Sequence, residues 1–230
     1  MFLSRAQLLG LAVAAVGMLT TARPATAQLA TYTFTGSPGT LAPTTVDPDV
    51  SAGSVNFTGS AGSQANILSD NFVFNAANST TSAALAVSNN SYFQFTVTPD
   101  SLKKMSLTSL DFDGAFGSAG GFVVRSSVDS FATNLQSQTW ATGYPTFTSY
   151  STDLTGSQFQ DLSSATTFRV YVFTTSGAGG NAAVFDNMAL NGFIPVPEPT
   201  SILAVSALAM TGVAGLRRRF ARRQPETTVA

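Results

Sequence analysis

Short runs in which apolar and polar residues alternate recur along this chain, each bounded by glycine, proline, asparagine or serine. The clearest covers residues 92–98, where Phe93, Phe95 and Val97 alternate with polar side chains. A period of two places one set of side chains in a core and the other in solvent, as in a β-strand. Many such runs with turn residues between them predict an all-β chain of the jelly-roll or β-sandwich type.

The predicted strands cover residues 31–35, 54–58, 71–75, 83–88, 92–98, 105–112, 121–126, 146–150, 167–174 and 183–190. The apolar parity changes between Leu107 and Leu110, which predicts a bulge near Thr108 and Ser109. Residues 167–174 are apolar at both parities, which predicts a central strand covered on both sides. A short helical turn is expected at 157–162.

Missing residue types limit the chemistry of this chain. It contains no histidine and no cysteine, which excludes Ser-His-Asp and thiolate catalysis, disulfides and thiolate metal sites. Residues 28–194 carry ten aspartates, no glutamate and only four basic residues (Lys103, Lys104, Arg125, Arg169), a net charge of −6. We therefore expect no nucleic-acid partner, because phosphate binding needs clustered Lys and Arg. We also predict that the chain is not an enzyme.

The aspartates remain the candidates for polar chemistry. Asp111 and Asp113 are two residues apart in a predicted strand, so their side chains point to one face. A polar turn, a Ca²⁺ site with oxygen ligands and a paired-carboxylate hydrolase are the alternatives there. Asp186 shares the parity of Val184, Met188 and Leu190. A carboxylate on that apolar face must lie at a bulge, pair with Arg125 or Arg169, or bind a cation. No other cofactor is expected.

Aromatic residues gather around Gly143 and Pro145. Trp140, Tyr144, Phe147 and Tyr150 fall within eleven residues. Exposed rings there would form a platform for sugar rings, and buried rings would be core. Trp140, Tyr144 and Tyr150 are therefore the candidate glycan-binding residues, with core packing as the alternative.

The N-terminus has the pattern of a secretory signal peptide over residues 1–27. Arg5 precedes an apolar run from Leu8, and Ala25 and Ala27 frame a small-residue cleavage site. Cleavage there by signal peptidase, after export by the general secretion machinery, would make Gln28 the first residue of the mature chain.

The C-terminus has three consecutive features that together form a tag. Val196, Pro197, Glu198 and Pro199 form a stretch that cannot continue a helix or strand. An apolar segment, residues 200–216, then has nearly the length of a membrane-spanning helix. Arg217, Arg218 and Arg219 follow and would hold the end of the chain in the cytoplasm. An ordinary membrane anchor is the alternative to a tag.

This order of motif, short helix and arginine cluster resembles the PEP-CTERM sorting signal of exported bacterial proteins. The resemblance covers residues 195–223, with 224–230 as a cytoplasmic tail, and leaves residues 28–194 as the β-sandwich ectodomain. It implies transient anchoring in the inner membrane, cleavage near the motif by an exosortase, and release to the cell surface or an extracellular matrix. Glu198 would be read by the exosortase rather than act in catalysis. A structural or adhesive role beside exopolysaccharide or in a biofilm is expected, and a carbohydrate-binding module, with or without calcium, is the alternative.

Overall fold

The computed structural model describes residues 27–34, 41–58, 64–68, 71–76, 80–141, 143–175 and 182–195. The predicted signal-peptide residues before Ala27, with Ala25, lie outside the described residues. So do the sorting motif at 196–199, the helix at 200–216 and Arg217, Arg218 and Arg219. Within the described ranges, no helix has the length and apolar character needed to cross a membrane.

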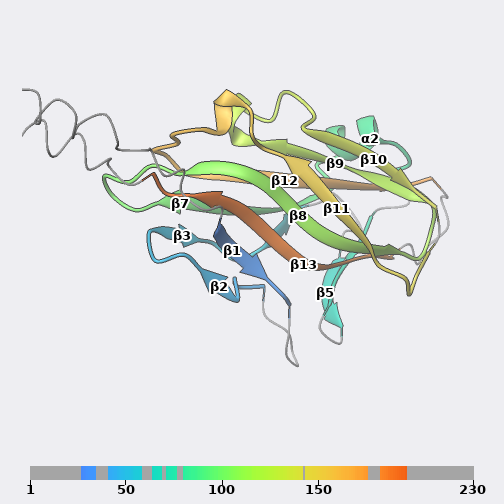
Figure 1. The fold of residues 1–230 in the computed structure, drawn as a ribbon. Coiled ribbons are helices and arrows are strands. Elements are labelled where there is room, and N and C mark those ends of the chain that lie inside the picture. The colour runs from blue at the N-terminus through green and yellow to red at the C-terminus, as the bar shows by residue number, and fades with distance from the viewer. Residues whose placement is uncertain are drawn as a thin grey trace, which may run out of the picture. The chain divides into compact units, whose positions relative to one another are not determined.

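Two antiparallel sheets form the domain, which confirms the predicted β-sandwich (Figure 1). Among the described residues, one sheet has seven strands in the order β11-β8-β13-β1-β2, with β6 also paired to β13 and β5 paired to β6. These strands are β1 (Ala27–Tyr32), β2 (Thr45–Val46), β5 (Gln64–Leu68), β6 (Asn71–Asn75), β8 (Ser106–Phe116), β11 (Thr148–Asp153) and β13 (Ala182–Phe193).

The second sheet has six described strands in the order β10-β9-β12-β7-β3, with β4 also paired to β7. Its strands are β3 (Val50–Ala52), β4 (Asn56–Thr58), β7 (Tyr92–Pro99), β9 (Gly120–Ser126), β10 (Gln136–Trp140) and β12 (Thr166–Thr174). Two 3-10 turns, η1 (Ser127–Asp129) and η2 (Ser157–Phe159), follow β9 and β11. η2 lies within the stretch where a helical turn was predicted.

Phenylalanine dominates the layer between the sheets. The buried side chains of Phe93, Phe112 and Phe185 come from both sheets and meet at the centre, with ring centroids 4.8 Å apart for Phe93 and Phe185 and 5.6 Å for Phe112 and Phe185. Tilted and edge-on ring contacts of this kind stabilise a core beyond the area they bury. Because the chain has no disulfide, the domain depends on its buried apolar side chains, of which these rings are part, for stability.

One predicted strand is wrong. Residues 83–88 form a helix, α2 (Ala83–Ser88), whose Ser82 cap accepts a hydrogen bond from the Leu85 amide. Alanine favours the helix and serine favours the N-cap position, and both preferences outweighed the apparent alternation. Ala86 of α2 packs on Tyr171 and Phe173 of β12, which covers the outer side of that strand. The prediction of a central strand covered on both sides is thereby confirmed for this part of β12.

Two bulges set which side chains of the central pair β8–β13 face the core. The register moves from Ser109 to Leu107 on β8 while β13 advances by one residue, so Thr108 is extra. This is the bulge predicted from the change of parity. A second shift lies between Asp186 and Ala189, where Asn187 has a left-handed backbone with φ 48°.

The second bulge corrects the sequence prediction for Asp186. Met188 and Leu190 are buried in the core, whereas Asp186 lies opposite Asp113 on the outer face. The prediction that these three share the apolar face is wrong, because Asn187 reverses the alternation between them. Of the three alternatives for Asp186, the bulge is the one that the structure shows.

Candidate functional site

The outer face of the seven-stranded sheet carries a repeated arrangement of carboxylates and neutral donors. Asp111 of β8 accepts hydrogen bonds from Ser151 Oγ of β11 at 2.6 Å and from Asn191 Nδ2 of β13 at 2.6 Å. Asp113 repeats the pattern two residues on. It accepts from Ser149 Oγ at 2.6 Å and from Asn187 Nδ2 at 3.0 Å. We call these residues the carboxylate ladder: Asp111, Asp113, Ser149, Ser151, Asn187 and Asn191.

The strand register produces the ladder. Ser149 lies opposite Asp113, and Ser151 lies opposite Asp111, because β11 and β8 pair without a bulge there. On the other side, the bulge at Asn187 brings its amide to Asp113. Every second residue of a strand shares a face, so the three strands present hydroxyls, carboxylates and amides side by side.

Neutral side chains surround the two carboxylates for which a polar turn, a Ca²⁺ site and a hydrolase pair were the alternatives. Both oxygens of Asp111 and both oxygens of Asp113 already accept hydrogen bonds from neutral side chains. In the part of the chain that is described, no three acidic, histidine or cysteine residues are grouped as metal ligands. Arg125 and Arg169 lie on the other sheet, so neither is the partner of Asp186. The ladder is therefore a hydrogen-bonding surface.

The four predicted aromatic residues divide into two pairs. Trp140 is buried and Tyr150 is half-buried, and both contact the ring of Phe116 in the core. Both rings therefore pack against the core, as the core-packing alternative expected, and their role in glycan binding stays a prediction. Tyr144 and Phe147 are instead exposed, at 59% and 38% of their surface.

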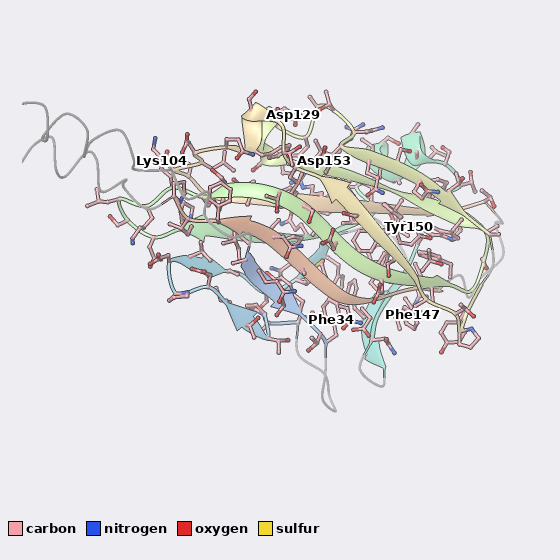
Figure 2. The ribbon with its side chains drawn as sticks, in the orientation of Figure 1. Phe34, Lys104, Asp129, Phe147, Tyr150 and Asp153 are labelled. Atoms are coloured by element: carbon pink, nitrogen blue, oxygen red, sulfur yellow. The ribbon has the colours of Figure 1, made fainter. Side chains whose placement is uncertain are left out.

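The exposed rings of Tyr144 and Phe147 belong to the loop before β11. The amides of Gly143 and Tyr144 both donate to the Phe116 carbonyl oxygen at 3.0 Å, which ties the loop to the end of β8. Phe147 comes directly before Thr148, the first residue of β11. Figure 2 shows Phe147 and Asp153 at opposite ends of β11, with Tyr150 between them.

Charge on this face is negative. Asp111, Asp113 and Asp186 lie on it, and Asp153 ends β11. Hydrogen bonds from the Thr155 amide and hydroxyl hold the pKa of Asp153 below its usual value, so it is ionised at neutral pH. Such a surface suits a neutral ligand rich in hydroxyl donors and repels polyanions.

Sequence reasoning missed the neutral half of the ladder. Ser149 and Ser151 share a parity that the sequence displays, but β11 was predicted only as far as Tyr150. The positions of Asn187 and Asn191 depend on the bulge and could not be placed from alternation. Tyr144 is exposed, so its glycan-binding role stays a prediction.

No protein-family model matches the sequence, and no curated protein matches it either. Among solved structures, the chain is similar to family 29 carbohydrate-binding modules. One mutant module is 10% identical with a TM-score of 0.36, over 74% of this chain and 93% of that chain. A mutant complexed with mannohexaose has 10% identity and a TM-score of 0.37 over the same shares. A third has 11% identity and a TM-score of 0.34, over 62% of this chain and 88% of that one. The residues of the site, rather than these similarities, carry the functional argument.

Proposed function

We propose that this chain is an exported, non-catalytic protein that binds a neutral polysaccharide on the outer face of its seven-stranded sheet. The observation that carries the proposal is the pair of exposed rings, Tyr144 and Phe147, on the loop that leads into β11, the strand that supplies the serines of the carboxylate ladder. Aromatic faces stack on the apolar faces of sugar rings, and carboxylates and amides bond the hydroxyls around the ring edge.

The chemistry of the ladder favours hydroxyl-rich ligands over catalysis. A sugar hydroxyl can replace a serine hydroxyl as donor to Asp111 or Asp113, because each carboxylate oxygen has two acceptor sites. The neutral serine and asparagine partners keep those carboxylates satisfied when no ligand is present. All four oxygens of Asp111 and Asp113 accept hydrogen bonds, so the ladder offers acceptors and neutral donors side by side to the hydroxyls of a sugar.

Delivery to the cell exterior is part of the proposal. The signal peptide at residues 1–27 and the PEP-CTERM-like tag at 195–223 support export, transient anchoring in the inner membrane and release by an exosortase. A protein released in this way beside exopolysaccharide would act as a structural or adhesive matrix component. Binding to that polysaccharide would be its means of attachment.

Affinity electrophoresis tests the binding proposal. The full chain, kept in a polyoxyethylene detergent that contains no sugar, is run through native gels with or without neutral glucans, mannans and galactans. We expect retardation by at least one neutral polymer, unchanged by a chelator because the ladder carboxylates use neutral donors. Equal mobility in every neutral polymer would contradict the proposal. Loss of binding with chelator would assign the ladder to calcium instead.

A further inference from the structure

Two arginines lie directly opposite each other on neighbouring strands of the six-stranded sheet. Arg169 of β12 pairs in register with Arg125 of β9 on one side and with Gln94 of β7 on the other. Gln94 in turn lies opposite Asn56 of β4. Asn56, Gln94, Arg169 and Arg125 thus form a row across four strands, about 14 Å long at the usual strand spacing. We call it the arginine row, and it lies on the outer face, beside the side chains that α2 covers.

Like charges directly opposite each other destabilise a sheet, so their position calls for a reason. The acceptors that hold the arginines are neutral. Arg125 Nε donates to Asn134 Oδ1 at 2.7 Å and its Nη1 to the Phe131 carbonyl oxygen at 2.8 Å. Arg169 Nε donates to Gln94 Oε1 at 3.0 Å. Between described residues the one salt bridge joins Lys103 to Asp49, so neither guanidinium has a carboxylate partner there.

Aromatic rings hold the Arg169 guanidinium in place. Its carbon lies 3.7 Å from the ring centroid of Phe131 and 4.4 Å from that of Tyr92. Phe131 reaches this position through two successive left-handed residues, Ser130 with φ 60° and Phe131 with φ 61°. A phenylalanine in that region is strained, and such strain is kept where the surrounding structure fixes a functional geometry. Both arginines are half-buried, so each keeps an exposed edge.

We propose that the arginine row binds the carboxylates of an acidic polysaccharide, at a site separate from the carboxylate ladder. A guanidinium has five N–H donors, and the described residues accept from two of them on each arginine. A planar fork held between rings matches a carboxylate in two parallel hydrogen bonds. The amides of Asn56 and Gln94 continue the row toward the hydroxyls of neighbouring sugars.

The number of arginines favours a carboxylate polysaccharide over a nucleic acid. Two arginines are too few for the phosphate contacts of a nucleic acid. The ladder on the opposite sheet is acidic and repels polyanions, so the two faces would bind chemically different glycans. A domain with two such faces would join acidic and neutral polymers in one matrix.

Titration with polygalacturonate and with its methyl ester, on the same full chain, tests the assignment. The ester has the same backbone without the charge, so we expect binding of the acid form and at least tenfold weaker binding of the ester. Arg169→Gln and Arg125→Gln should each lower affinity for the acid form roughly 10-fold to 100-fold. Arg169→Lys, which keeps the charge and loses the fork, should weaken it as well. Circular dichroism verifies that each variant is folded.

Two controls distinguish binding at the arginine row from a general effect of net charge and from binding at the carboxylate ladder. Lys104→Gln removes the same charge from an exposed lysine in the β7–β8 turn and should leave affinity unchanged. Tyr144→Ala should also leave polygalacturonate binding unchanged. Equal losses in Lys104→Gln and Arg169→Gln would overturn the proposal. Binding to dextran sulfate but not to polygalacturonate would also overturn it. A third contradicting result would be that no glycan binds and that Arg169→Gln instead abolishes a salt-sensitive dimer.

Discussion

The indole of Trp140 lies flat on the ring of Phe116, with centroids 3.4 Å apart and planes 9° apart. Its Nε1 donates to the Ser118 carbonyl oxygen at 2.9 Å. Phe116 ends β8, and its own carbonyl oxygen accepts from the amides of Gly143 and Tyr144. The ring pair and the loop that presents Tyr144 are therefore anchored at the same residue. Disturbing the stack should disturb the domain and the loop that carries Tyr144 together.

Phe116→Ala should destabilise the domain by about 3–5 kcal/mol, as expected for a buried phenylalanine that leaves a cavity. Because Trp140 is the chain's single tryptophan, its fluorescence reports urea unfolding, and its emission should move to the red in the folded variant. The exposed Phe147→Ala is the matched control and should change stability by less than about 0.5 kcal/mol. Equal stabilities for the two variants would mean that the stack contributes nothing.

The bulge at Asn187 makes a second prediction. Its φ of 48° disfavours any residue with a Cβ, and asparagine tolerates it better than alanine. Asn187→Ala should therefore be less stable than Asn187→Gly by about 1 kcal/mol, although both lose the bond to Asp113. Chemical denaturation of the two variants measures this difference. An alanine variant at least as stable as the glycine variant would show that the backbone is not constrained as described.

The depressed pKa of Asp129 makes stability depend on pH. Slight burial raises that pKa, but hydrogen bonds from Thr133 and Ala132 outweigh the effect of burial and hold the pKa below its usual value. Stability from this carboxylate is present above the unfolded-state pKa of about 3.9 and is lost as pH falls through the folded-state pKa. In Asp129→Asn, the urea midpoint of unfolding should therefore change less with pH between about pH 5 and pH 2 than it does in the wild-type protein. The same slope in the wild-type protein and in Asp129→Asn would refute the prediction.

The sequence predicted the fold class because alternation is a local property. The faces of Phe93, Phe95 and Val97 follow from period two alone, and the bulge at Thr108 follows from its interruption. α2 was missed because six residues are too few to separate a helical period from alternation, and the Ser82 cap decided the outcome. β10 was missed because its outward residues are polar and only Trp140 is buried.

The candidate site was less predictable because it depends on pairing between distant strands. Asp111, Asp113 and Tyr144 were recognisable from residue type and spacing. Nothing local indicates that β11 lies beside β8 in the register that joins Ser149 to Asp113. The arginine row has the same origin, since Arg125 and Arg169 are 44 positions apart in the chain and meet only through β9 and β12.

The export proposal predicts the ends of the mature protein. Cleavage after Ala27 would leave Gln28 in β1, where it pairs with Asn191 of β13. Intact-mass analysis of cell-surface material should give a chain that begins at Gln28 and lacks residues 201–230. Full-length protein that stays in the membrane would mean an ordinary anchor instead of a sorting signal.

Binding of a neutral polysaccharide by aromatic variants tests whether the exposed rings hold the sugar. Tyr144→Ala and Phe147→Ala should each weaken binding of the retarding polymer about tenfold, because each removes a stacking face. Phe57→Ala is the matched control, since Phe57 is 40% exposed on β4 of the other sheet. We expect Phe57→Ala to bind with full affinity. We expect Tyr144→Ala to remain folded and to lose affinity for neutral polymers only. Wild-type affinity in both Tyr144→Ala and Phe147→Ala would contradict the proposal.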